Sequence, residues 1–332
     1  MTGPAARARR AAAGGLQEGS ALGAYVAERL LLSAVTLVGM VLAAFVLISV
    51  LPGDPLELLF SYRRDPAAVE RMRRELGLDA PLTHRFWRFL WKAVQGDLGH
   101  SLRTREPVSR AIAERLRVSL HLALAAMSVG SVGGLALGVV AAGGHGGRAE
   151  HVAMLLSLVG LSTPVFWLGL LLQFYLGYEL GWFPISGWGS WRHLVLPALT
   201  LGVRYAASIA RYTRAFLLEV LGADFIRTAR AKGLSTRRVL LGHALPNALP
   251  SLVTVLGLDL AGLLTGAVLT ETIFGIPGVG RLAYEAIYFR DYFLVQGTVL
   301  FMGAIFVVAN LLVDLSYAWL NPRIRYGPGG GR

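Results

Sequence analysis

Six long apolar stretches constrain this chain more strongly than any other feature of its sequence. A helix needs about 20 apolar residues to cross a bilayer. Charged residues make up only 16% of the chain and hydrophobic ones 55%, whereas soluble domains usually carry about 25% charged residues. We therefore expect an all-α integral membrane protein with six transmembrane helices, at residues 30–51, 122–142, 152–177, 194–218, 249–269 and 293–320.

The distribution of Lys and Arg predicts which ends of these helices face the cytoplasm. Short cytoplasmic loops of membrane proteins carry an excess of positive charge. If both termini are inside, the basic tails and the basic loop between the fourth and fifth helices are cytoplasmic. The two short outer loops then hold only Arg192, Arg281 and Arg290. We therefore expect an N-in/C-in topology.

This topology divides the chain into five parts. A terminal segment rich in Ala, Gly and Arg is expected to be a disordered basic tail. The predicted parts are the tail at 1–25, the first transmembrane helix at 26–51, a structured external insert at 52–117, a five-helix core at 118–320 with a cytoplasmic loop at 219–246, and a cytoplasmic tail at 321–332.

The external insert contains the patterns of two helices. Asp65 and Pro66 are typical of a helix start and Gly77 of the residue after a helix end, so the first helix is expected between them. Residues 81–96 form an amphipathic pattern with aromatic residues four apart. This second helix either lies on the outer leaflet, with its aromatic side chains at headgroup level, or docks a partner protein.

Three glycines of the second apolar stretch stand four residues apart, at Gly130, Gly134 and Gly138. Small residues at this spacing lie on one face of a helix and allow a second helix to approach closely. We expect this face to pack against a neighbouring transmembrane helix.

The basic loop before the fifth apolar stretch has the pattern of two short helices. Asp224 is a suitable N-cap, residues 225–232 give about two helical turns, and Gly233 suits the left-handed position after a helix. Ser235 can cap a second helix, and Pro246 marks the entry to the next transmembrane helix. We expect a compact unit that transmits a push to the helices on either side. The alternative is that its cations only anchor the topology.

Polar side chains inside the apolar stretches are candidates for a substrate path. An aspartate in a membrane span costs about 2.5–3.5 kcal/mol on insertion scales, so Asp259 is expected to face a partner or a water-filled path. The alternative is an ion pair between Asp259 and Arg204. Gln173 and Asn310 are weaker candidates for the same path.

Several enzyme and cofactor classes have no motif in this sequence. Neither Lys92 nor Lys232 follows a glycine, so the chain has no P-loop. It has no cysteine, no H-E-x-x-H zinc helix and no G-x-S-x-G nucleophile elbow, and its seven histidines lack ligand spacing. We expect no catalytic residue, no metal and no cofactor in this chain. Its net charge of +12 is attributed to topology and anionic lipid, not to nucleic acid.

Several segments, in order along the chain, resemble one family of membrane proteins. These segments are LPGDP, GDLGHSLRTREPV, STPVFWLGLLL, LGWFPISG, LPALTLG, RTARAKGL and GAVLTETIFGIPGVGRL. Together they resemble the inner-membrane permeases of ABC importers, in the dipeptide/oligopeptide/nickel branch, over nearly the whole chain.

The basic loop resembles the signature E-A-A-x-x-x-G-x9-I-x-L-P of these permeases. It matches the general pattern at Ala229, Gly233, Leu245 and Pro246, and departs from it most clearly at Arg227, where the family has Glu. The resemblance implies that the short helix of the loop sits in a groove of a separate ATPase. The residues implied in this coupling are Asp224, Phe225, Arg227, Thr228, Ala229, Arg230, Lys232, Gly233, Leu245 and Pro246.

The resemblance implies a transport function in the plasma (inner) membrane of a prokaryote. Such a permease forms half of a path for short peptides, together with a second, similar permease. Two cytoplasmic ATPase subunits bind ATP and Mg, and an extracellular or periplasmic solute-binding protein delivers the solute. Nickel or another small solute stays open as the cargo.

Two alternatives come from other functional classes. One is an intramembrane hydrolase that uses Asp259 and Asp314 as paired carboxylates. The other is a receptor or scaffold, whose insert binds a partner while the inner loop signals.

Overall fold

The computed structural model describes residues 28–47 and 66–320, so the predicted tails at 1–25 and 321–332 lie outside the described residues. Within the described ranges the regular structure is helical, apart from an isolated bridge between His100 and Pro107. The first described helix is Glu28–Leu47. It is followed by α3 (Pro66–Glu75), α4 (Leu82–Val94), α5 (Val108–Gly143), α6 (Arg148–Ser162), α7 (Val165–Leu172), the π-helix η1 (Gln173–Glu179), α8 (Trp191–Leu221), α9 (Asp224–Ala231), α10 (Thr236–Val239), the π-helix η2 (Leu240–Ala244), α11 (Leu245–Gly266), α12 (Val268–Ile273), α13 (Val279–Tyr288) and α14 (Tyr292–Leu320).

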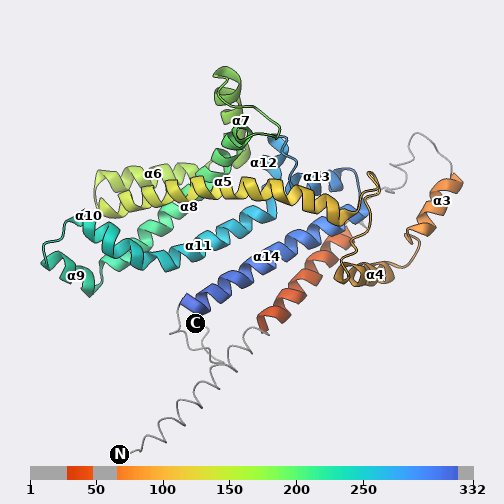
Figure 1. Ribbon diagram of the computed structural model, residues 1–332, viewed down its shortest axis with the longest axis horizontal. Helices are drawn as coiled ribbons and strands as arrows, with labels where there is room; N and C mark the ends of the chain where they lie inside the picture. Colours follow the sequence, from red (N-terminus) through yellow and green to blue (C-terminus); the bar gives the residue numbers. More distant parts are fainter. Residues whose placement is uncertain (1–27, 48–65, 321–332) are drawn as a thin grey trace, which may run out of the picture.

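The long helices form an elongated bundle with two distinct ends (Figure 1). At one end lie α9 and α10, and at the other lie α12, α13 and α4. Helix α5 packs most extensively against α8, α6 covers α8, and α11 packs against α14. This arrangement separates the basic loop from the insert by the length of the bundle.

Five helices of the described residues are long and apolar enough to cross a membrane. They are Glu28–Leu47, α5, α8, the continuous helix Thr236–Leu264 and α14. Helices α6 and α7 with η1 also pass this test as a pair, but the pair is bent by 97°. The described part of the chain therefore has five candidate spans, or six if the bent pair counts as one.

The prediction of one continuous helix over 152–177 is wrong. Thr163 and Pro164 are extended, with ψ angles of 122° and 128°, and they separate α6 from α7. The ring of Pro164 disfavours helical geometry at the residue before it, so the chain turns there. Helix α7 then projects from the side of the bundle instead of continuing along it (Figure 1).

The structure also moves two predicted boundaries. Helix α5 begins at Val108, so the boundary predicted between insert and core, after residue 117, falls inside it. Helix α11 ends at Gly266 and α12 begins at Val268, so the stretch predicted at 249–269 contains a break. Apolar composition alone shows neither boundary. A helix can continue beyond its apolar part, as α5 does, and an apolar stretch can contain a break between two helices, as 249–269 does.

The spaced glycines of α5 face α8. A Cβ added at Gly130 would stand 2.8 Å from Cβ of Tyr205, and one at Gly134 would stand 2.6 Å from Cβ of Ile209. A Cβ at Gly138 would overlap Thr213. The backbones of α5 and α8 can therefore approach this closely only because the three glycines have no side chains.

The insert contains the two helices that the sequence predicts. Helix α3 begins at Pro66, and Gly77 after it has the left-handed φ of 63°. Helix α4 is amphipathic: Phe86 is buried, while Trp87 and Trp91 are 65% and 70% exposed. The buried face of α4 packs with side chains of the first helix and of α14, so the insert is anchored on the bundle.

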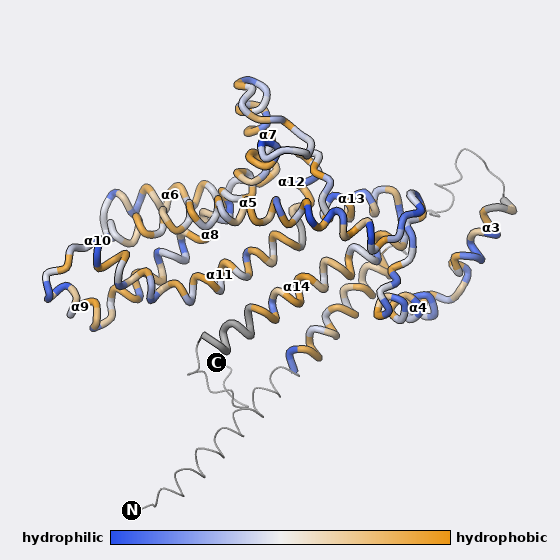
Figure 2. The backbone as a smooth tube through the Cα atoms, in the orientation of Figure 1, coloured by the Kyte–Doolittle hydropathy of each residue, from blue (hydrophilic) through white to orange (hydrophobic). Residues whose placement is uncertain are grey.

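The hydropathy of the surface fits a membrane environment. Apolar residues run along the long helices, and polar residues gather at the ends of the bundle (Figure 2). Large apolar side chains in the middle of the helices are exposed, among them Val132, Leu156 and Val253. Contiguous exposed apolar surface of this kind is unfavourable in water and favourable against lipid tails.

Candidate coupling site and substrate path

Helix α9 is a short amphipathic helix at one end of the bundle. Ile226 and Ala229 are buried, and because they are three residues apart they lie on one face of the helix. In the described residues the side-chain hydrogen bonds of α9 stay within α9, from Arg227 and Thr228 to Asp224. The apolar face therefore holds α9 on the bundle.

The outward face of α9 is basic and carries one aromatic ring. Phe225 is 46% exposed, and Arg227, Thr228 and Arg230 are exposed as well. Lys232 is exposed immediately after the helix. These residues were associated with coupling from the sequence, and in the structure each of them is exposed.

The N-cap predicted at Asp224 is wrong by one residue. Ala223 has the extended N-cap conformation, and Asp224 is the first residue of the helix. The Asp224 carboxylate pairs with Nη1 of Arg227 at 3.3 Å instead of capping an amide. An acidic residue in the first turn still favours the helix dipole, and a pair this exposed contributes little to stability.

Gly233 forms the turn after α9. Its φ is 77°, and a Cβ added there would meet nothing within 4 Å. Glycine is therefore required by the left-handed backbone conformation, not by lack of space.

The second helix of the loop continues into the membrane-spanning helix. Ser235 occupies its N-cap position, and α10, η2 and α11 then follow without a break. As predicted, Pro246 lies at the entry to the next span, because it occupies the first turn of α11, which continues from η2 without interruption. Proline has no N–H to donate, and the change of hydrogen-bond pattern after a π-helix accommodates it.

An apolar cluster connects the loop to three long helices. Ile226 and Val239 pack with Ala142 at the end of α5, Leu217 of α8 and Leu252 of α11. Interiors of this kind are close-packed and transmit displacement. Helix α9 therefore packs through this cluster against several long helices.

A buried carboxylate holds the turn between α5 and α6 near this cluster. Oε1 of Glu150 accepts a hydrogen bond from Nε of Arg214 at 2.6 Å. Its Oε2 accepts one from the Gly146 amide at 2.5 Å and lies 3.1 Å from Nδ1 of His145. This site is not predictable from the sequence, because 64 residues separate Glu150 from Arg214 and no motif links them.

Asp259 lies in the middle of α11 and is half-buried. Its Oδ2 has no hydrogen-bond partner among the described residues. The ion pair with Arg204 that the sequence allows as an alternative does not form in the described structure, although Arg204 and Tyr205 on α8 lie within electrostatic range. A role for Asp259 in a substrate path stays a prediction.

The other predicted path residues lie in different surroundings. Nε2 of Gln173 donates hydrogen bonds to the carbonyls of Ile185 at 2.7 Å and Ile273 at 3.2 Å, which ties η1 to α12. Asn310 lines a groove between α14 and the first helix, opposite Thr36. The structure thus does not gather Gln173 and Asn310 around Asp259.

A second buried carboxylate organises the opposite end of the bundle. Oε1 of Glu271 accepts a hydrogen bond from Oγ of Ser119 at 2.6 Å, and Oε2 accepts one from the Arg281 amide at 2.9 Å. Ser119 Oγ in turn accepts from the Val279 amide at 2.8 Å. Burial raises the pKa of Glu271, and these hydrogen bonds oppose the rise. The carboxylate therefore fixes the N-terminus of α13 against α5 and α12.

The glycines before and within α13 make room for Glu271. A Cβ at Gly278 would overlap the Glu271 carboxylate, and one at Gly280 would lie 3.0 Å from it. This explains the spacing in the segment GIPGVG, which the sequence analysis noted only as a resemblance.

A third buried carboxylate anchors the loop between α4 and α5. Oδ2 of Asp291 accepts hydrogen bonds from Oγ of Ser101 at 2.5 Å and from the Arg103 amide at 3.3 Å. In the same loop, a hydrogen bond from the Gly99 amide lowers the pKa of Asp97. Across residues 28–47 and 66–320, no group of three or more His, Asp and Glu side chains is placed to hold a metal ion.

Two family models match the chain in succession. Residues 23–123 match the N-terminal model of binding-protein-dependent transport system membrane components. Residues 134–326 match the model of the binding-protein-dependent transport system inner membrane component. The chain belongs to this family of permeases. As a permease of an ABC importer, it works in the membrane with ATPase and binding-protein partners.

Curated relatives match this permease over nearly its whole length. It is 43% identical to the glutathione transport system permease protein GsiC of Pectobacterium atrosepticum over 302 residues, which cover 91% of this chain and 99% of that protein. It is 42% identical to GsiC of Escherichia coli strain K12 over the same shares. The protein is therefore an inner-membrane, multi-pass permease of the peptide/nickel branch, as its motifs indicate.

A solved structure shares the fold of the permease core. The structure, of the MetNI methionine ABC transporter in an inward-facing conformation, matches with a TM-score of 0.52 and 20% identity. The match covers 62% of this chain and 96% of that chain. At this identity the likeness concerns the fold alone.

Proposed function

We propose that this permease forms half of the translocation path of an ATP-driven importer of short peptides. The observation that carries the proposal is the identity of 42–43% to permeases named for glutathione transport, along 99% of their length. Glutathione is a tripeptide, so the proposed substrate class is a peptide of about that size. Dipeptides and longer oligopeptides belong to the same class.

The proposed assembly contains a second, similar permease and two ATPase subunits. ATP and Mg are bound by the ATPases, and a binding protein delivers the peptide from outside. The six-helix, N-in/C-in topology of the proposal places α9 in the cytoplasm, where the ATPases are. The separation of α9 from the insert along the bundle supports this arrangement (Figure 1).

We assign the contact with the ATPase to the outward face of α9. Phe225, Arg227 and Arg230 are exposed there, while Ile226 and Ala229 bind the helix to the bundle. An exposed aromatic side chain beside cations is the kind of surface that protein interfaces use. The apolar cluster under α9 then carries movement of the ATPase to α5, α8 and α11.

Uptake by the complete transporter tests the substrate class. The permease is purified with its ATPases and second permease, placed in proteoliposomes with the binding protein outside, and supplied with ATP inside. We expect ATP-dependent uptake of labelled glutathione or of a labelled dipeptide. Uptake of ⁶³Ni²⁺ without uptake of peptide would show that the transported substrate is nickel and not a peptide.

The variant Phe225→Asp tests the coupling contact. The change removes the aromatic ring from the proposed contact and buries a carboxylate in its place, which is costly, so we expect loss of ATPase co-purification and of uptake. Tyr288→Asp is the matched control, since Tyr288 is a 68% exposed aromatic residue on α13 at the other end of the bundle. Co-purification should survive in the control. Equal co-purification for both variants would refute the assignment to α9.

The same reconstituted transporter distinguishes transport from the two other functions considered, an intramembrane hydrolase and a receptor or scaffold. An intramembrane hydrolase would cleave peptides and lose this activity in Asp259→Asn and Asp314→Asn; the side chain of Asp314 lies outside the described residues. A receptor or scaffold would show no uptake with all partners present. Either result would reject the transport proposal.

A further inference from the structure

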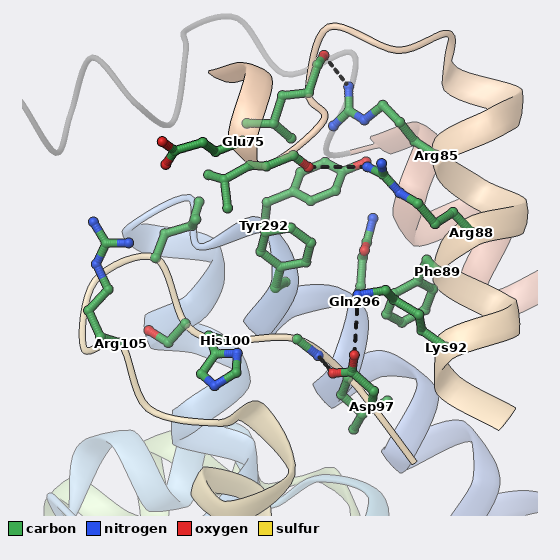
Figure 3. A pocket seen from close by; sticks show the side chains of 17 residues that line it. Glu75, Arg85, Arg88, Phe89, Lys92, Asp97, His100, Arg105, Tyr292 and Gln296 are labelled. Carbon is green, nitrogen blue, oxygen red and sulfur yellow. Dashed lines mark hydrogen bonds and ion pairs between the residues drawn. The ribbon is translucent and has the colours of Figure 1, made fainter. Parts of the chain in front are cut away.

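A cavity lies where the insert meets α14 (Figure 3), at the end of the bundle opposite α9 (Figure 1). Its volume is about 300 Å³, and it is lined by the end of α3 and the turn after it, by α4 and the loop that follows, and by the first residues of α14. This volume is at the lower end of the range of ligand pockets. The cavity is separate from Asp259, Gln173 and Asn310, which do not line it.

Gln296 of α14 has an unpaired amide in the wall of this cavity. The side chain is 1% exposed, and among the described residues neither its Nε2 nor its Oε1 has a hydrogen-bond partner. Figure 3 shows it pointing into the cavity between Tyr292 and Phe89. Buried polar groups are nearly always paired, so an amide with both ends free indicates a missing partner. A group that presents an acceptor beside a donor, as a peptide bond does, satisfies both ends at once.

The charged side chains that line the cavity give it a positive bias, because four are basic and two are acidic: Arg85, Arg88, Lys92 and Arg105 against Glu75 and Asp97. Lys92 is paired with Asp97 at 3.3 Å. Arg88 donates to the carbonyls of Leu76 and Gly77 at 3.1 Å, and Arg85 to that of Leu78 at 3.3 Å. These carbonyls orient the two guanidinium groups without neutralising their charge. A ligand with a carboxylate is therefore favoured.

We propose that this cavity binds the carboxyl-terminal part of a short peptide, with the Gln296 amide pairing with a peptide bond and Arg85 and Arg88 attracting the terminal carboxylate. The inference rests on the proposed function for its substrate class. It adds a reception site on the insert, outside the path through the bundle.

Hydrogen–deuterium exchange on the complete transporter in nanodiscs, without the binding protein, tests the proposal locally. The probes are triglycine and triglycine amide, each titrated to about 10 mM, a range that detects millimolar affinity. We expect triglycine to slow exchange in residues 82–105. Triglycine amide, which lacks the carboxylate, should bind on the order of 10-fold more weakly.

The decisive variant is Gln296→Leu. It keeps the size of the side chain and removes two unpaired polar atoms, so the variant should fold with an unchanged or higher melting temperature. We expect its affinity for triglycine to fall on the order of 10-fold or more. The control is Thr298→Val, a buried residue of α14 whose hydroxyl bonds within the helix and does not line the cavity. Its affinity should match that of the unaltered protein.

Two results would overturn the proposal. One is the absence of peptide-dependent protection in the unaltered transporter, as expected if water or lipid fills the cavity. The other is equal protection in Gln296→Leu. Peptide uptake is measured on the same preparations, so uptake without protection rejects the cavity and leaves the proposed function standing. Protection without uptake would support peptide binding in the cavity and reject the proposed transport function.

Discussion

The unit formed by α9 and α10 and the unit formed by α12 and α13 lie at opposite ends of one bundle and are held by different contacts. Ile226, Ala229 and Val239 bind the first unit through apolar packing. Apolar packing of Leu282 and Ala286 also holds the second unit, but there Glu271 adds hydrogen bonds to Ser119 and to the Arg281 amide at the start of α13. The second end is thus held by directional contacts in addition to apolar packing.

This difference bears on which end can move. Apolar contact is non-directional, so a helix held by it can tilt or slide while most of its burial is kept. A buried carboxylate with several donors has one favourable geometry, and leaving a donor unpaired is costly. We therefore expect the α9 unit to move with the ATPase while the α12–α13 unit stays in place.

The largest expected effect is that of Glu271→Ala. The change leaves the Ser119 hydroxyl and the Arg281 amide without their acceptor and opens a cavity, which we expect to cost about 4 kcal/mol. The measurement is the melting temperature of the detergent-solubilised protein, followed by size-exclusion chromatography. Glu285→Ala is the control, because Glu285 forms a partly exposed pair with Arg281 at 2.8 Å and should cost less than about 1 kcal/mol. Similar losses in both variants would show that the buried Glu271 carboxylate holds the α12–α13 unit no better than a partly exposed ion pair does.

The next effect is that of Ile226→Ala in the α9 unit. Removing a fully buried isoleucine side chain should cost about 3 kcal/mol. The loss should be local, so hydrogen–deuterium exchange should accelerate in residues 224–244 and not in 271–291. Leu241→Ala, at a position 41% exposed, should change exchange little. Faster exchange at both ends would show that the two units unfold together.

The smallest effect is that of Gly233→Ala. The left-handed φ of 77° makes alanine less favourable there by about 1 kcal/mol. Gly242→Ala is the matched control: a Cβ there also meets nothing within 4 Å, but the residue is helical and alanine should stabilise it slightly. The measurement is the rate of hydrogen–deuterium exchange in residues 224–240, compared between the Gly233→Ala and Gly242→Ala variants. If both variants were stabilised, the turn at Gly233 would not need its left-handed conformation.

The sequence predicts best where the structure depends on neighbours along the chain. The turn at Gly233, the helix that ends before Gly77 and the face made by Gly130 and its repeats all follow from local rules. The bend at Pro164 is also local, and the proline was visible in the sequence. The length of the apolar run at 152–177 outweighed it in the prediction, and this is why the bend was missed.

Other features depend on contacts between distant segments. Ser119 and Glu271 are 152 residues apart, and Ser101 and Asp291 are 190 apart, so no spacing rule connects them. The free amide of Gln296 is likewise invisible in the sequence, since any glutamine can be paired. Only the packing of α4 against α14 leaves it beside a cavity.

The sequence by itself determined that this protein is a helical membrane permease, because the lipid-crossing lengths, the charge distribution and the family motifs are local properties of the chain. The tertiary structure decided which polar groups are buried and what they contact. The reason is that burial is set by the approach of helices far apart in sequence, and the free energy of a buried polar group depends on the partners that this approach supplies.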